Sequence, residues 1–136
     1  MEILSALPIT ALYAGILALI LLGLSFGTGA ARNRSKVSLG DGGNPDLLVA
    51  IRRHGNAVEY VPMILLLLAL LEANGASPTL LHVLGAGLVV ARIAHPLGLS
   101  SERMVHPLRI AGAAFTSLIM VVAGGYAIWQ SASTLF

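Results

Sequence analysis

The sequence predicts an all-α integral membrane protein, a bundle of four membrane-spanning helices that forms one domain over residues 1–136. The first observation is composition: 57% of the residues are hydrophobic and 10% are charged, whereas a soluble domain carries about 25% charged residues. The mean hydropathy is +0.88. The second observation is the pattern, because short polar segments separate four apolar stretches. Each stretch reaches the roughly 20 helical residues that cross a bilayer.

The first predicted span covers residues 8–31 and contains no charged residue. The preceding MEILSAL has no Lys or Arg, unlike the basic start of a cleaved signal peptide, so we expect a retained span. Residues 32–46 are polar and contain the turn sequence DGGNP, which predicts a loop. Three further spans follow, separated by the NGASP turn and the SSERMVH connection; we predict them over residues 47–73, 79–99 and 107–131.

The distribution of basic residues predicts how the chain crosses the membrane. All eight Lys and Arg residues lie in or beside the first and third loops, which four spans place on one side: Arg32, Arg34, Lys36, Arg52, Arg53, Arg92, Arg103 and Arg109. By the positive-inside rule this side is cytoplasmic, and both termini face away from the cytoplasm. In a bacterium the membrane would be the inner one. The formal net charge is only +2, so no nucleic-acid partner is expected.

The chain contains no cysteine. This excludes disulfides, thiolate metal ligands and a cysteine nucleophile, and no metal site is predicted. A thiol that takes part in chemistry here must therefore arrive with a substrate.

A polar stripe lies on the second span. Successive helical residues turn by about 100°, so Arg52, Asn56 and Glu59 share one face, with Tyr60 beside it. Glu59 lies about 10 Å further along the helix than Arg52, at 1.5 Å per residue. A charge within a membrane costs about 2.5–3.5 kcal/mol on insertion scales. We therefore expect Glu59 to face protein or a water-filled cavity and to have a partner.

The third and fourth spans add polar residues at a similar depth. Arg92 and His95 lie one turn apart on the third, and Arg109 is the third residue of the fourth. Several arginines around one buried acid would form a pocket for an anionic ligand. Two structural alternatives stay open. Glu59 and Arg92 would be an interhelical ion pair that fixes packing, and four arginines would be anchors at the membrane interface: Arg52, Arg53, Arg103 and Arg109.

Three segments of the chain resemble one family of membrane proteins. They are RRHGNAVEYVP at residues 52–62, ARIAHPLG at 91–98 and HPLR at 106–109. Together with the four spans, they resemble the membrane-associated proteins in eicosanoid and glutathione metabolism, which include microsomal glutathione transferases. The resemblance implies a homotrimer of four-helix subunits. It also implies that glutathione, the co-substrate, binds between neighbouring subunits near the cytoplasmic face.

The resemblance also implies roles for individual residues. Arg52, Asn56 and Glu59 match the glutathione-binding stripe, and Tyr60 matches an adjacent position that some members use. Arg92 and His95 match third-helix positions that contact glutathione. Arg109 matches the fourth-helix arginine that stabilises the thiolate, with one inserted residue in the alignment.

Two departures from the family pattern concern Leu99, where the eicosanoid enzymes have a glutathione-contacting Tyr, and Gly55, where prostaglandin synthase has another Arg. Both remove polar contacts, so the specialised eicosanoid activities are not implied.

The function that these residues favour is a membrane-bound glutathione transferase, or peroxidase. An arginine would stabilise the glutathione thiolate, which attacks a lipophilic electrophile from the bilayer. Two alternatives stay open: a non-catalytic membrane scaffold of the same fold, and a small four-helix transporter. Small multidrug exporters carry their essential Glu in the first span, and residues 8–31 here contain no acid.

Overall fold

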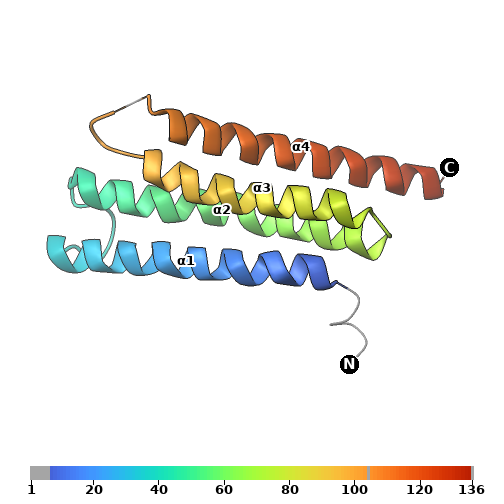
Figure 1. Cartoon of the computed structure of the whole chain (residues 1–136). Coiled ribbons are helices and arrows are strands. Elements are labelled where there is room, and N and C mark those ends of the chain that lie inside the picture. Colours follow the sequence, from blue (N-terminus) through green and yellow to red (C-terminus); the bar gives the residue numbers. More distant parts are fainter. Residues whose placement is uncertain (1–6, 104, 136) are drawn as a thin grey trace.

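The computed structural model describes residues 7–103 and 105–135, and within them it contains four α-helices and no strand. The helices are α1 (Pro8–Ser35), α2 (Pro45–Ala73), α3 (Pro78–Gly98) and α4 (Pro107–Leu135). Consecutive helices run in opposite directions (Figure 1). Each is long and apolar enough to cross a membrane. The predicted all-α bundle of four spans is therefore confirmed.

All four helices begin at a proline. Proline suits the first turn because its φ is already helical and its missing N–H has no partner there in any helix. The start of α2 also has a side-chain cap, since Asn44 Oδ1 accepts hydrogen bonds from the backbone N–H groups of Asp46 and Leu47 at 3.0 and 3.1 Å. These local signals place the helix starts within two residues of the predicted spans.

The predicted loop over residues 32–46 was wrong at both of its edges. α1 continues to Ser35, and α2 already begins at Pro45. Hydropathy marks the part of a helix that fits in lipid, whereas the helix continues beyond it as long as its backbone bonds are made. Arg32 and Arg34 in the last turn of α1 suit the negative end of the helix dipole. The helix ends at Lys36, whose φ is 56°. α4 likewise continues past residue 131, to Leu135.

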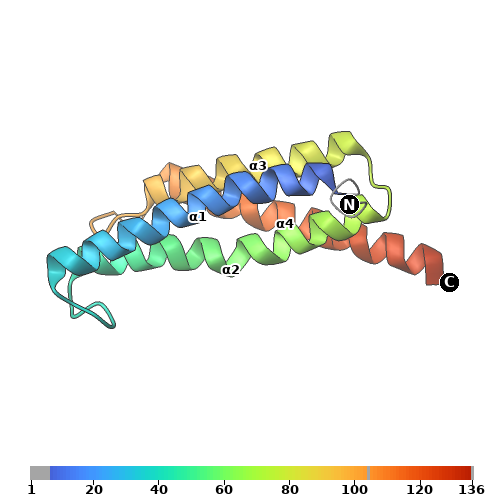
Figure 2. The same cartoon turned by 90° about the horizontal axis from the view of Figure 1, so that it is seen from below.

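Helices α2 and α3 lie between the other two. α1 and α4 each contact both of them but do not contact each other within the described residues. Figure 2 shows the bundle from below, with α1 running along α2 and α3. A core of buried apolar side chains joins the helices; its most completely buried leucine and isoleucine residues are Leu17, Ile64, Leu68, Leu71, Leu81 and Leu88. Large apolar side chains are also exposed on the outer faces, as expected for contact with lipid.

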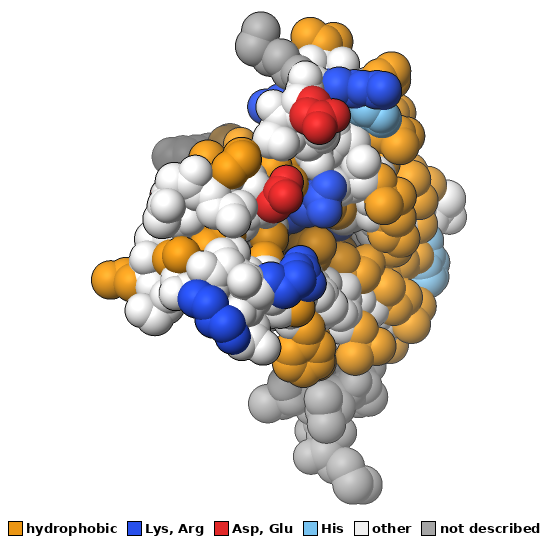
Figure 3. All heavy atoms as spheres, turned by 90° about the vertical axis from the view of Figure 1, so that its left-hand side faces the viewer, with side chains coloured by type: hydrophobic (Ala, Val, Ile, Leu, Met, Phe, Trp, Pro, Cys, Tyr) orange, Lys and Arg blue, Asp and Glu red, His pale blue; other side chains and the backbone are white. Residues whose placement is uncertain are grey.

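The two ends of the bundle differ in charge. The start of α1, the end of α4 and the 74–77 turn lie at one end, and residues 36–44, 99–103 and 105–106 lie at the other (Figure 1). Figure 3 shows Lys, Arg and acidic side chains gathered on the second end. The arrangement thus separates basic loops from termini, as predicted. The assignment of the basic end to the cytoplasm stays a prediction.

Two glycines let α3 and α4 approach closely near the basic end. A Cβ on Gly112 would lie 2.7 Å from the backbone nitrogen of His95, and a Cβ on Gly98 would lie 2.2 Å from the backbone nitrogen of Arg109. Neither position has room for a larger residue without a backbone shift. This contact fixes the height of α4 against α3, and with it the positions of the polar residues that both helices carry.

Candidate functional site

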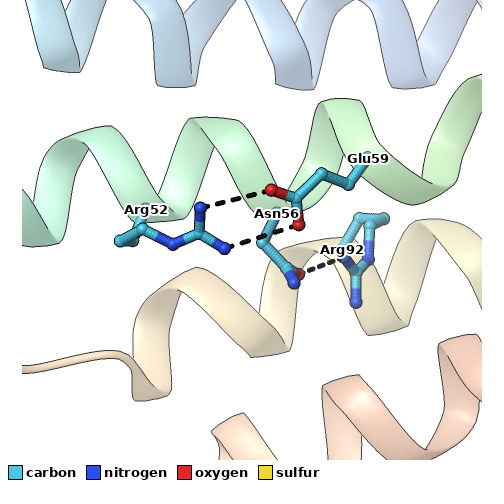
Figure 4. Close-up of polar contacts among 4 residues, drawn as sticks. All are labelled: Arg52, Asn56, Glu59 and Arg92. Carbon is cyan, nitrogen blue, oxygen red and sulfur yellow. Dashed lines mark hydrogen bonds and ion pairs between the residues drawn. The ribbon is translucent and has the colours of Figure 1, made fainter.

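Arg52 and Glu59 form an ion pair on α2. Arg52 Nη1 and Nη2 donate to the two carboxylate oxygens of Glu59 over 3.2 and 3.4 Å. The residues lie two turns apart, so both side chains leave the same face of the helix (Figure 4). Their side chains are 52% and 51% exposed. The charged pair therefore faces outward from the single chain.

Arg92 lies inside the bundle and joins three helices. It is only 2% exposed. Its Nη1 donates to Oδ1 of Asn56 on α2 at 2.8 Å (Figure 4). Its Nη2 donates to the carbonyl oxygen of Gly112 and to the hydroxyl of Thr116, both on α4. The Thr116 hydroxyl donates in turn to Gly112 O at 2.7 Å. A buried guanidinium thus finds acceptors on both neighbours, which a charge out of water requires.

Tyr60 and His95 flank the Arg92 side chain. The guanidinium carbon of Arg92 lies 6.0 Å from the centre of the Tyr60 ring, at the edge of the range for a cation–π contact. His95 is buried, one turn beyond Arg92 on α3, where α4 passes at Gly112. In the single chain, Tyr60 is partly accessible and His95 is not.

Arg109 lies in the first turn of α4, at the same end of the bundle as Arg52. It is partly buried, and its backbone packs directly against Gly98. Its place in the fold is therefore fixed by the same α3–α4 contact that holds His95. Arg109 is therefore carried by α4, whereas the polar stripe is carried by α2.

The structure brings together Arg52 with Glu59 on α2, and Asn56, which lies between them in the sequence of α2, with Arg92 on α3. The alternative in which Glu59 pairs with Arg92 was wrong, because Arg52 lies on the same helical face and reaches both oxygens of Glu59. Thr116 was missed. Its signal in the sequence was its spacing, one turn after Gly112 inside an apolar span, where a hydroxyl needs a partner.

A second arginine on α2 links the ends of two helices. Arg53 Nη2 donates to the carbonyl oxygen of Leu99 at 2.7 Å. Leu99 is the residue that follows α3. This contact ties the 99–106 segment to α2 and gives Arg53 a role in the fold that is separate from the stripe.

The fold and site define a multi-pass membrane protein with an arginine-rich polar site that extends from buried Arg92 inside the apolar bundle to the exposed Arg52–Glu59 pair on α2. The chain belongs to the MAPEG family, whose sequence profile matches residues 10–129. This confirms the resemblance inferred from the motifs and places the chain among membrane proteins of the glutathione and eicosanoid metabolism family.

Two curated proteins of similar sequence both have the name "Inner membrane protein YecN". One is from Escherichia coli (strain K12) and one from Escherichia coli O6:H1 (strain CFT073). Each is 42% identical to this chain over 90 residues, which cover 66% of this chain and 69% of the relative. No solved structure matches the chain significantly. The name of the relatives agrees with the predicted integral, multi-pass membrane location.

Proposed function

We propose that the protein is a membrane-bound glutathione transferase, or peroxidase, that uses glutathione as its co-substrate against a lipophilic electrophile. The observation that carries the proposal is the outward-facing Arg52–Glu59 pair on α2. Charges at this depth are costly against lipid. A protein that keeps two of them half exposed has a use for them other than packing its own helices.

Glutathione matches this pair chemically. It carries two carboxylates and one ammonium group. A bound molecule would therefore replace the Arg52–Glu59 ion pair with two ion pairs between the protein and glutathione. Arg52 would hold a carboxylate with its two-pronged guanidinium. Glu59 would accept from the ammonium. Because Arg52 and Glu59 already hold each other by two hydrogen bonds, little side-chain ordering would be needed on binding.

The remaining residues would complete the site in two ways. Tyr60 is partly accessible beside the pair, and we assign it a contact with the ligand. Arg92 and His95 are covered by α4 in the single chain. We assign Arg92 the task of orienting Asn56 through their hydrogen bond. A direct contact of Arg92 or His95 with glutathione would require the ligand to enter between helices.

The reaction needs a thiolate. A free thiol has a pKa of about 8.5, and a nearby arginine lowers the pKa of a bound thiol by stabilising its anion. We assign this task to Arg109. The thiolate would then attack an electrophile that is dissolved in the bilayer and reaches the site between helices.

In a homotrimer, the Arg52–Glu59 pair would be covered and no longer exposed. A neighbouring subunit placed against α2 would cover the Arg52–Glu59 pair and enclose a ligand there, which one small bundle does not do. The trimer is proposed from the family resemblance and from this exposed pair. Native mass spectrometry that finds only monomers would count against it.

The non-catalytic scaffold has an observation in its favour as well. Arg52, Glu59, Asn56 and Arg92 all have partners within the chain, so the stripe is stable without a ligand. The experiment that separates the two is calorimetric titration of glutathione into the purified protein in detergent. We expect binding to the wild type, and binding at least ten-fold weaker with Glu59→Gln. Glu102→Gln, at an exposed residue outside the helices, is the matched control. No heat with the wild type would favour the scaffold.

A further inference from the structure

A second cleft, separate from the polar stripe, opens between α1, α2 and the Ser100–Ser101 segment at the basic end of the bundle. Its volume is about 440 Å³. It contains none of the residues Arg52, Asn56, Glu59 or Arg92. The proposed transferase chemistry therefore does not use it.

The inner part of the cleft is apolar, and two glycines on α1 leave it open. Gly23 and Gly27 lie one turn apart and line it together with small or aliphatic residues of both helices. A Cβ at either glycine would meet no atom within 4 Å. These glycines are therefore not needed for helix packing, and their missing side chains leave the space open. Thr28 holds the two walls together, since its hydroxyl donates to Ala50 O on α2 at 3.0 Å.

The outer part of the cleft is polar and carries charges of both signs. Arg34 from the last turn of α1 and Arg53 from α2 line it, with Asp46 from the first turn of α2. The hydroxyl-bearing Ser100 and Ser101 close the mouth. In the described part of the chain, no hydrogen bond or ion pair engages the side chains of Arg34 and Asp46.

The two parts are ordered along the membrane normal. Gly23 precedes Arg34 by eleven residues, which is about 16 Å along the helix at 1.5 Å per residue. The apolar part therefore lies at the depth of acyl chains, and the charged part lies at the depth of headgroups. Soluble anions would match only the charged part.

We propose that this cleft binds a glycerophospholipid. Its phosphate would lie between Arg34 and Arg53, and one acyl chain would follow the surface left open by Gly23 and Gly27. Arginine pairs well with phosphate oxygens. Asp46 at the rim favours a headgroup that also carries an ammonium group, so the expected ligand is an aminophospholipid such as phosphatidylethanolamine.

The test is native mass spectrometry of the delipidated protein in detergent, titrated with phosphatidylethanolamine. We expect one tightly bound lipid per chain. Gly27→Leu should weaken this binding at least ten-fold, because the leucine would occupy the apolar part without meeting another residue. Gly29→Leu is the control, since Gly29 also faces open space but does not line the cleft. Arg34→Gln should weaken binding by a similar factor, and Arg103→Gln, outside the cleft, should not.

Other outcomes would overturn the proposal. Equal lipid binding by Gly27→Leu and Gly29→Leu would show that lipid associates elsewhere on the bundle. Binding of inorganic phosphate that competes with the lipid and is insensitive to Gly27→Leu would show a soluble anion site instead. Glutathione titration of the same variants keeps this proposal distinct. The cleft proposal is supported if Gly27→Leu and Arg34→Gln weaken lipid binding while glutathione binding is unchanged. If the two variants weaken lipid binding and even the wild type does not bind glutathione, the cleft proposal stands and the transferase proposal fails.

Discussion

Arg92 on α3 donates a 2.8 Å hydrogen bond to the side-chain oxygen of Asn56 on α2, and through its other terminal nitrogen it binds α4. One buried side chain thus connects the helix that carries the proposed glutathione contacts to the two helices behind it. The orientation of the Asn56 side chain depends on that guanidinium.

Thr116→Val tests this network first. Valine keeps the shape of threonine but removes one of the two acceptors of Arg92 Nη2, so that only the carbonyl oxygen of Gly112 remains for this nitrogen. We expect a loss of about 1–3 kcal/mol in the free energy of unfolding, the cost of a buried group left unsatisfied. Unfolding in detergent followed by circular dichroism measures it. Thr134→Val, at an exposed residue near the end of α4, is the control. Equal stability of the two variants would mean that the Arg92–Thr116 bond contributes little.

The start of α1 provides a second prediction. No side chain of its own caps this helix. Instead, the Glu72 carboxylate at the end of α2 accepts hydrogen bonds from the backbone N–H groups of Ile9 and Thr10 at 2.9 and 2.7 Å. Glu72→Ala removes both bonds, and we expect the free energy of unfolding to fall by about 0.5–2 kcal/mol, as for other helix N-terminal caps. Glu72→Gln should lose less, because an acceptor remains.

Protease sensitivity near residue 8 and thermal unfolding would both report the change at Glu72. Glu102→Ala, in the 99–106 segment, serves as the control. A Glu72→Ala variant as stable as the control would show that water replaces the cap without cost.

The sequence predicted the spans and the stripe well, because both depend on periodicity. Apolar runs mark spans, and a spacing of three or four residues places Arg52, Asn56 and Glu59 on one face. The partners were harder to predict. Whether Glu59 meets Arg52 or Arg92 depends on the rotation and height of α3 against α2. The close contacts at Gly98 and Gly112 set the height of α4 against α3, and with it the meeting of Thr116 with Arg92. Sequence spacing alone does not contain these rotations.

The cleft at Gly23 and Gly27 was also outside the reach of the sequence. Glycines in a membrane helix usually indicate close contact between helices, and Gly112 follows that rule. Gly27 does not, since it faces open space. Only the positions of α1 and α2 distinguish a glycine that permits contact from one that leaves a hollow.

Topology gives a third prediction. The basic end of the bundle should face the cytoplasm, so fusions at the C-terminus should be active only with a reporter that works outside the cytoplasm. A fusion placed after Lys36 in the 36–44 loop should show the opposite preference. Paired reporters of both kinds at both positions provide the measurement. Cytoplasmic activity at the C-terminus, with the opposite result in the loop, would reverse the orientation.

The last prediction separates binding from chemistry at the proposed glutathione site. Arg52→Ala should weaken glutathione binding, because Arg52 would hold a carboxylate whose charge does not change during the reaction, and the paired Glu59 would lose its partner. The free energy of glutathione binding should weaken by about 2–5 kcal/mol if the remaining charge stays buried and unpaired in the complex.

Arg109→Ala should leave the binding of protonated glutathione nearly intact and lower turnover instead. The reason is that Arg109 would face a sulfur that carries negative charge only after deprotonation, so its loss should raise the pKa of the bound thiol. Ultraviolet absorbance of the thiolate against pH, measured beside binding isotherms and rates, tests both variants, with Arg103→Ala as the control for charge at this end of the bundle. If Arg109→Ala leaves the thiolate titration and the turnover unchanged, Arg109 is an interface anchor; if Arg52→Ala binds glutathione as the wild type does, the stripe on α2 is structural.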